Sequence, residues 1–369
     1  MADNDWVSSR CTFGEGRPGS SRGQAYARPL GEGQARFPCD HVTPVRAVSA
    51  RHRVTTSRVR RVGWVTVATM TAPAPSQTRA LGPHTTVLFG AEQGKYPDGN
   101  TVLVRGRAGS VAIDPALSAR GAGLKVDRVL LTHAHEDHVA GVSAVEWAEL
   151  SVHEADLEAL HSVEGLMRLY GLAGAAAEEM TRIVCERFFF VGWPQATGLQ
   201  DGDVVDLGGV TVRLIHAPGH TGGHSVYLIE PDGVLVIGDI DLTGFGPYYG
   251  DAVSSLEEFD ATLKMVREIE AQHYVTFHHK GVIDGHATFA TAMDAFAGAI
   301  DRRTRALLDL LAGGPRSFAQ LHEHGIVYRA GTRPAGFGDS VERYSIERHL
   351  ARLLADGAVA ADGQQYWLP

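Results

Sequence analysis

The sequence predicts an α/β protein whose main domain has sheets inside and helices outside. Short β-prone runs separated by Gly, Pro and Asp turns fill residues 85–113, and a second set fills residues 203–237. Apolar residues recur at helical spacing between these halves, over residues 154–187, and after them, over residues 255–271. Two β-rich halves with helices between them favour a four-layer sandwich, with the sheets packed together and helices covering both outer faces.

The first half should form a meander of neighbouring strands that leads into a buried strand. Val and Leu dominate the run at residues 126–131, which is long enough for one strand. The other predicted strands of this half are residues 85–90, 100–105, 110–113 and 150–153. Leucines at helical spacing in residues 154–187 predict two or three helices inserted before the second half.

The second half repeats the pattern, with turns at Gly208-Gly209 and at Pro231-Asp232-Gly233. Its predicted strands are residues 203–207, 210–216, 225–229, 234–237 and 273–278. We therefore expect one large domain over residues 80–295. A chain of 369 residues is long enough to hold a smaller domain beside it.

Residues 300–369 predict a small α+β module that resembles a winged helix. Residues 302–311, 317–323 and 341–356 have helical patterns, and Asp362-Gly363 is favoured chemistry for a closing hairpin turn. Residues 301–369 hold nine basic and eight acidic side chains, whereas a DNA-reading module would want a basic face. The expected role is therefore packing or formation of a homodimer.

Residues 1–75 are rich in Gly, Arg, Ser and Pro and show no sustained periodicity, so we expect disorder. One hypothesis is that translation begins at Met70 and that residues 1–69 are not native; the alternative is a basic tail that binds a partner. These 75 residues carry a net charge of +6, which leaves −15 for the remainder. An acidic body argues against a broad nucleic-acid surface, because phosphate binding needs clustered Lys and Arg.

Cysteine usage and hydropathy place the chain in the cytoplasm. Cys11, Cys39 and Cys185 are odd in number and include no Cys-x-x-Cys pair, so no disulfide framework is expected. No apolar run approaches the length needed to cross a bilayer. Arg60-Arg61 resembles a twin-arginine export signal only faintly, because the apolar stretch that follows is short and broken.

A dense group of histidines and carboxylates follows the buried strand at residues 126–131. His133, His135, Asp137 and His138 fall within six residues, and alternation along an extended chain lets His133 and His135 project together. Neutral imidazole and carboxylate are the ligands that zinc and similar divalent metals prefer. A single histidine would suggest a helix cap or a wet surface, but this density predicts a metal site.

Three further predicted strands also stop at a potential ligand. They lead to His220 and His224, to Asp239, and to the pair His278-His279. Loops that share one edge of a sandwich would bring these side chains to the first group. Together they offer seven ligands, enough for two metals with room for water.

Residues 132–138, 218–224 and 238–239 resemble the T-H-x-H-x-D-H, P-G-H-T-x-G-H and G-D motifs of the metallo-β-lactamase-fold hydrolase superfamily. The resemblance covers about residues 80–290. It implies a first metal held by His133, His135 and His220. It implies a second held by Asp137, His138 and a histidine of the last motif, with Asp239 bridging. The implied cofactors are two divalent ions, zinc first, with iron or manganese as alternatives.

The last motif departs from the family pattern Gly-His-Gly, because Phe277-His278-His279-Lys280-Gly281 stands in its place. Aligning Phe277-His278 with the usual Pro-Gly makes His279 the expected ligand and His278 the alternative. No cysteine lies in a motif, so the cysteine ligand of one lactamase class has no counterpart.

In such a centre two cations would generate a bridging hydroxide near neutral pH. Asp137 would be the catalytic residue that orients this hydroxide or passes a proton to the leaving group. His224 would support catalysis by fixing ligand orientation together with Asp114, or would merely cap a turn. Tyr248 and Tyr249 are candidates for substrate contact.

The resemblance therefore implies a metal-dependent hydrolase of a small acyl substrate, similar to hydroxyacylglutathione hydrolases and lactonases, that cleaves a thioester, a lactone or an ester. A ribonuclease of the same fold is one alternative. A non-hydrolytic protein, either an iron dioxygenase relative or a binding module that kept the ligands, is the other.

Overall fold

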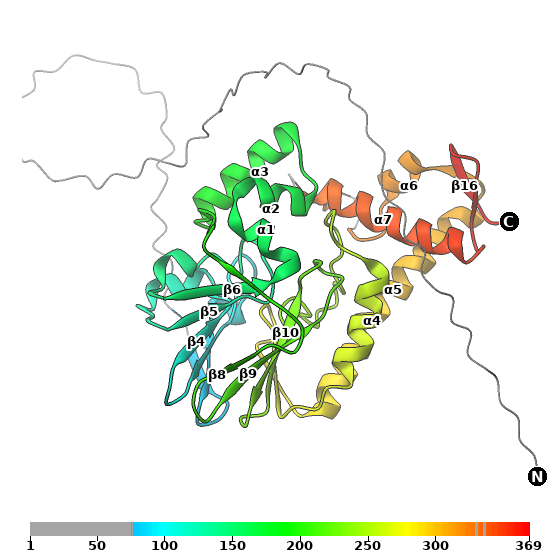
Figure 1. Ribbon diagram of the computed structural model, residues 1–369. Coiled ribbons are helices and arrows are strands. Elements are labelled where there is room, and N and C mark those ends of the chain that lie inside the picture. Colours follow the sequence, from blue (N-terminus) through cyan, green and yellow to red (C-terminus); the bar gives the residue numbers. More distant parts are fainter. Residues whose placement is uncertain (1–74, 76, 329–330, 335–336) are drawn as a thin grey trace, which may run out of the picture. The chain divides into compact units, whose positions relative to one another are not determined.

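The structure is a computed structural model that describes residue 75 and residues 77–328, 331–334 and 337–369 (Figure 1). The predictions of a disordered extension over residues 1–75 and of a start at Met70 therefore fall on residues outside the described ones, apart from Pro75. The same holds for the arginine pair at residues 60–61.

The first sheet of the described chain has seven strands in sequence order. They are β1 (Gln77–Ala80), β2 (Thr85–Phe89), β3 (Thr101–Arg105), β4 (Ser110–Ile113), β5 (Arg128–Leu130), β6 (Glu149–His153) and β7 (Thr197–Leu199). The first four form an antiparallel meander, of which β2 to β4 were predicted, and from β4 onward the neighbours run parallel. Parallel strands place their carboxyl ends at one edge, which is where β5 delivers the histidine-rich loop.

The second sheet has the strand order β13-β12-β11-β10-β9-β8. These strands are β8 (Val204–Asp206), β9 (Thr211–His216), β10 (Ser225–Glu230), β11 (Val234–Val236), β12 (His273–Val275) and β13 (Val282–Asp284). All neighbours are antiparallel except β11 and β12. Because these two strands are parallel, the segments that follow them lie at the same edge of the sheet. These segments carry Asp239 and His278.

The two sheets pack face to face because their apolar side chains alternate. In β3, Val102 and Val104 pack between the sheets, whereas Leu103 joins the core on the opposite face. In β10, Tyr227 packs between the sheets and Val226 lies on the other side. Alternation with a period of two thus gives each sheet two buried faces and creates the predicted four layers.

Helices cover both outer faces (Figure 1). Leu166 and Leu169 of the predicted insert pack on the first sheet. Phe259 and Phe289 pack on the second. The helices are α1 (Leu157–His161), α2 (Val163–Tyr170), α3 (Gly174–Arg187), α4 (Leu256–Arg267) and α5 (His286–Ala312), with short 3-10 turns at Ala91–Gln93, Leu117–Gly121, Val142–Ala144 and Glu154–Asp156. No helix within the described ranges combines the length and the apolar character needed to cross a membrane.

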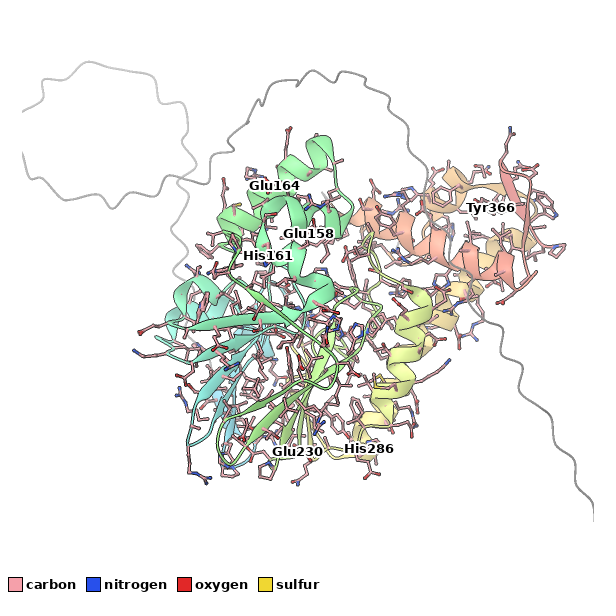
Figure 2. All side chains as sticks on the ribbon, viewed as in Figure 1. Glu158, His161, Glu164, Glu230, His286 and Tyr366 are labelled. Atoms are coloured by element: carbon pink, nitrogen blue, oxygen red, sulfur yellow. The ribbon has the colours of Figure 1, made fainter. Side chains whose placement is uncertain are left out.

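The C-terminal region has its own core. Leu307 and Leu311 at the end of α5 pack with Leu321, Ile346 and Leu350. The remaining elements are β14 (Arg316–Ser317), α6 (Phe318–His324), α7 (Gly338–Ala355), β15 (Ala360–Ala361) and β16 (Gln365–Trp367), with Tyr366 of β16 labelled in Figure 2. The sheet order is β14-β16-β15. The predicted hairpin is present, and the winged-helix description stays a prediction.

The helix predicted at residues 302–311 is the second part of α5, which begins at His286. A single helix therefore crosses the interval between the predicted domains 80–295 and 300–369. Its first half packs on the second sheet through Met293 and Phe296, and its end packs in the C-terminal core.

The prediction did not include β1, β7, β13 and β14. These strands are two to four residues long, and β1 reads Gln-Thr-Arg-Ala, which has no apolar alternation. All four lie at sheet edges, where pairing with a neighbour rather than side-chain burial defines the strand.

The aromatic contact between α5 and the second sheet should carry measurable stability. The rings of Phe289 and Tyr274 stack with centroids 3.7 Å apart, and both side chains are fully buried. We expect Phe289→Ala to lower the free energy of unfolding by about 3–5 kcal/mol, measured by urea denaturation. Val191→Ala is the control, because Val191 is 63% exposed and its loss should cost under about 0.5 kcal/mol. Equal effects of the two changes would contradict this packing.

Candidate metal centre

The histidine-rich loop is fixed in place by Asp114, which follows β4. The Thr132 backbone N–H donates to Asp114 Oδ1 at 2.8 Å, and the Thr132 hydroxyl donates to Oδ2 at 2.7 Å. His138 Nδ1 lies 2.9 Å from the same Oδ2. Because Asp114 and Thr132 are fully buried, these bonds set where the loop leaves the sheet.

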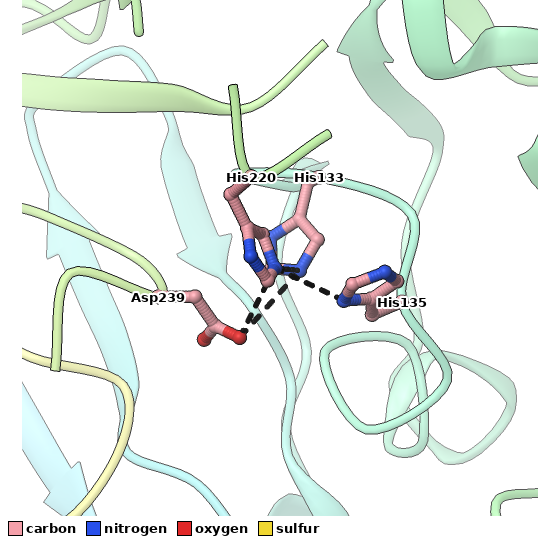
Figure 3. Close-up of side chains that lie close together, drawn as sticks. All are labelled: His133, His135, His220 and Asp239. Atoms are coloured by element: carbon pink, nitrogen blue, oxygen red, sulfur yellow. Dashed lines mark hydrogen bonds and ion pairs between the residues drawn. The ribbon is translucent and has the colours of Figure 1, made fainter. Parts of the chain in front are cut away.

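Four predicted ligands meet in a first group, drawn in Figure 3. His220 Nε2 lies 3.1 Å from His133 Nε2, 3.1 Å from His135 Nδ1 and 3.2 Å from Asp239 Oδ2. All four donor atoms are within 4.8 Å of one another. Ligands of a tetrahedral zinc ion would be about 3.3 Å apart, so this donor set fits a divalent cation.

A second group consists of Asp137, His138 and His278. His278 Nε2 lies 2.9 Å from Asp137 Oδ2. All three residues are buried, and they come from the loop after β5 and the chain after β12. One carboxylate and two imidazoles again form a donor set suited to a divalent metal.

The Asp239 carboxylate lies between the two groups. Its Oδ2 faces His220 at 3.2 Å and His133 at 3.9 Å, whereas its Oδ1 faces His138 at 2.9 Å and His278 at 3.9 Å. Each carboxylate oxygen therefore lies beside a different ligand group. This is the arrangement that a bridging carboxylate requires.

The last histidine differs from the expectation. The structure places His278, not His279, in the second group, where its Nδ1 also bonds to the carbonyl of Gly94 at 2.8 Å. His279 lines the neighbouring cavity and has a positive φ of 62°, so its side chain leaves the strand direction differently. Aligning Phe277-His278 with the usual Pro-Gly shifted the expected ligand by one residue.

The ligand candidates are oriented by bonds on their far ring nitrogens. His135 Nε2 lies 2.8 Å from Asp251 Oδ2, and His220 Nδ1 lies 2.9 Å from the carbonyl of Tyr248. Donation from one nitrogen fixes the tautomer and leaves the other free for a metal. Asp251 and the Tyr248 carbonyl were not singled out from the sequence, because an aspartate without a motif gives no signal there.

His224 is buried behind the centre and belongs to neither group. Its Nδ1 bonds to the carbonyl of Ala217 at 2.9 Å, and its Nε2 accepts the backbone N–H of Asp239 at 3.3 Å. Burial lowers the pKa of His224 to about 3, so the ring is neutral and can accept that bond. It therefore holds the backbone of Asp239.

Asp156 links the two histidine loops and was also missed. Its Oδ2 accepts the hydroxyl of Thr221 at 2.6 Å and the backbone N–H of Ala134 at 3.3 Å, and its Oδ1 accepts the N–H of Gly223 at 2.8 Å. These bonds join the loop at residues 132–138 to the loop at residues 218–224. In the sequence Asp156 resembles an ordinary first-turn helix residue.

The electrostatics differ among the histidines. Burial lowers the pKa of His133 well below its usual value, and the neighbouring imidazoles add to this effect. Burial also opposes charge on His135 and His278, but Asp251 and Asp137 respectively outweigh it and raise each pKa to about 9. Without a metal these two rings therefore hold a proton at neutral pH.

A cavity of about 350 Å³ adjoins both groups. Its walls come from the helical insert, from the chain after β11 and from the C-terminal region. Aromatic and apolar side chains dominate these walls: Tyr96, Tyr170, Leu172, Met180, Phe245, Tyr248, Tyr328, Phe337 and Val341. Of the two tyrosines singled out from the sequence, Tyr248 lines the cavity, whereas Tyr249 is buried away from it.

Glu136 is a buried carboxylate in this cavity that the sequence did not single out. It accepts the hydroxyl of Tyr170 and, at 3.3 Å, that of Tyr96. Burial and the charge of Asp137 raise the pKa of Glu136. Its place between two motif ligands gave no separate signal.

Residues 97–279 match the family model described as "Metallo-beta-lactamase superfamily". The chain carries a domain of this superfamily. A hydroxyacylglutathione hydrolase of Acidiphilium cryptum is 29% identical over 219 residues, which cover 58% of this chain and 76% of the relative. A human acyl-coenzyme A thioesterase is 29% identical over 228 residues, covering 52% of this chain and 79% of that protein.

Solved structures agree on the fold. A metallo-beta-lactamase family protein from Thermus thermophilus superposes with a TM-score of 0.58 at 24% identity, covering 79% of this chain and 100% of that one. A beta-lactamase domain protein from Burkholderia ambifaria gives a TM-score of 0.57 at 20% identity, covering 82% and 96%.

Metal affinity should rise with pH in the range from 6.5 to 8.5. His135 and His278 have pKa values raised to about 9, so a metal must displace their protons below that pH. We expect zinc affinity to increase by roughly tenfold per pH unit for each proton displaced and to level off above about pH 9. Calorimetric titration in two buffers of different ionisation enthalpy would count the released protons. A pH-independent affinity with no proton release would contradict this charge state.

Proposed function

We propose that this chain is a dinuclear metal-dependent hydrolase that cleaves acyl thioesters. The coarser assignment, a metal-dependent hydrolase, follows from the superfamily domain and from relatives with hydrolase names. The dinuclear part of the proposal rests on Asp239, whose two carboxylate oxygens lie beside separate ligand groups at the edge of one cavity.

The proposed ligands are His133, His135 and His220 for one cation and Asp137, His138 and His278 for the other, with Asp239 between them. Zinc is the proposed metal, since imidazole and carboxylate in near-tetrahedral spacing suit it. Two such cations would supply Lewis acidity and lower the pKa of a bound water.

In this proposal Asp137 is both a metal ligand and the group that transfers a proton. One carboxylate oxygen contacts His278, and the residue also lines the cavity. Contacts with His278 and His138 outweigh burial and hold the pKa of Asp137 below its usual value, so it is ionised. An ionised carboxylate at the cavity wall can accept a proton from the attacking water and deliver it to the thiolate leaving group.

His224 acts through Asp239. By accepting the N–H of Asp239 it fixes the backbone from which the bridging carboxylate projects. Gly238 leaves room for this contact, because a β-carbon there would lie 2.6 Å from His224 Nε2. His224 is thus a positioning residue in the proposal, and it does not touch the substrate.

The cavity lining favours an uncharged acyl group. No Lys or Arg is among the described residues that line it, whereas Glu136 and Asp241 are. A carboxylate on the acyl group would meet no Lys or Arg in these walls and would lie in a cavity that two further carboxyl groups line, which costs free energy. Apolar chains would instead contact Leu172, Met180 and Val341.

Thioesters are preferred over lactones and esters because of the relatives. One relative is named an acyl-coenzyme A thioesterase, and another is named for an acyl-glutathione. Both names describe an acyl group carried on sulfur. The cytoplasmic location and the homodimer remain predictions from the sequence.

Removing the bridging carboxylate should abolish metal pairing and turnover together. We expect Asp239→Ala to reduce bound metal from two ions to at most one and to lower kcat on an acyl thioester by about a thousandfold. Metal analysis of protein purified without chelator and a thiol-release assay would measure both. Asp284→Ala is the control, since its exposed carboxylate pairs with Arg79 at the surface. Retained turnover in Asp239→Ala would exclude the proposed centre.

The charge of the acyl group should affect kcat/KM for thioester hydrolysis. Among thioesters of uncharged N-acetylcysteamine, we expect hexanoyl to exceed succinyl in kcat/KM by about tenfold or more. Met180→Lys should narrow this difference by placing a cation in the wall, whereas Met180→Gln should leave it. Faster cleavage of the succinyl thioester by the unmodified protein would contradict the proposed acyl class.

A further inference from the structure

The segment at residues 245–255, between β11 and α4, holds two of the proposed metal ligands in place. Asp251 bonds to His135 Nε2 at 2.8 Å, and the carbonyl of Tyr248 bonds to His220 Nδ1 at 2.9 Å. The hydroxyl of Ser254 donates to the backbone carbonyl of His220 at 2.7 Å. Orientation of both imidazoles therefore depends on the path of this segment.

This segment has no helix or strand of its own over residues 245–254. Several of its backbone carbonyls instead accept hydrogen bonds from arginines of α5 and α7. Arg348 of α7 donates from Nε to the carbonyl of Ser254 at 2.9 Å. Its Nη2 donates to the carbonyls of Asp251 and, at 3.3 Å, Ala252.

Helix α5 holds the first part of the same segment. Arg303, which is buried, donates to the carbonyl of Pro247 at 2.5 Å and to that of Phe245 at 2.9 Å. The Tyr249 hydroxyl lies 2.8 Å from His349 Nε2 on α7.

Packing leaves the segment little freedom against α7. A β-carbon on Gly250 would lie 2.6 Å from Val341, so the backbone and this helix are in direct contact. Charge-assisted bonds from a guanidinium to carbonyls are stronger than neutral ones, and an unpaired buried carbonyl is costly. The low-energy path of residues 245–255 is therefore the one that α5 and α7 impose.

We propose that Arg348 is a positioning residue through which the C-terminal region sets the geometry of the first ligand group. It acts by holding Asp251 and Ser254, which in turn orient His135 and His220. The C-terminal region is thus part of the metal centre as well as a wall of the cavity. This inference rests on the proposed metal ligands, and not on the identity of the substrate.

The test uses Co²⁺ as a spectroscopic probe and separates the two ligand groups by their own variants. In a His278→Ala background the second group lacks a ligand, so cobalt reports on His133, His135 and His220. We expect Arg348→Met in this background to weaken cobalt binding by about tenfold and to shift the visible bands. In a His135→Ala background, where the second group remains intact, Arg348→Met should change neither.

Arg352→Met is the matched control. Arg352 lies one turn further along α7, and its Nε bonds to Glu257 on α4 at 3.3 Å, away from the ligand groups. Losing that exposed contact should leave the cobalt affinity and bands unchanged. If α7 contributed only to fold stability, Arg352→Met and Arg348→Met would change the cobalt affinity and bands to the same extent.

Unchanged bands and affinity in a folded Arg348→Met variant would overturn the proposal. If that variant does not fold, Arg348→Lys decides, because one ammonium cannot replace the fork that serves three carbonyls. It should give a smaller shift, and cobalt properties identical to those with arginine would again overturn the proposal. Failure of the unmodified protein to bind cobalt would instead remove the metal centre itself.

Discussion

Mutual neutralisation of buried charge governs the arrangement of this domain. Asp137 and Asp239 contact imidazoles from three separate loops, and Asp114 holds His138 from behind. Each carboxylate would be costly to bury alone, and the imidazoles that contact it lower this cost. The net effect is a set of neutral or paired groups that a pair of cations could complete. The loops that carry them converge because β4 to β6 are parallel and β11 pairs in parallel with β12.

The sequence predicted most of this because its signals were local. The Val- and Leu-rich strands, the leucine spacing of the insert and the spacing of His133, His135 and His138 all act over a few residues. Parallel alignment then does the assembly, so residues more than one hundred positions apart reached the same edge as expected.

What the sequence could not predict depends on long-range pairing. Asp156 and Asp251 have no motif, and each matters only because a distant backbone or imidazole lies beside it. Which of His278 and His279 faces Asp137 depends on the path of the chain after β12, which the spacing of the motif does not encode. The edge strands β1 and β13 are defined by their partners rather than by their own side chains.

The unbroken course of α5 restricts how this protein can change. The helix has 27 residues, and each residue added to or removed from it would rotate everything beyond by about 100°. Such a turn would swing Arg303 and the whole C-terminal core away from the cavity wall. Substitutions can be absorbed along its exposed side, and length changes can be absorbed in loops. The length of this one helix, however, would have to stay the same in any variant that keeps the C-terminal core at the cavity wall.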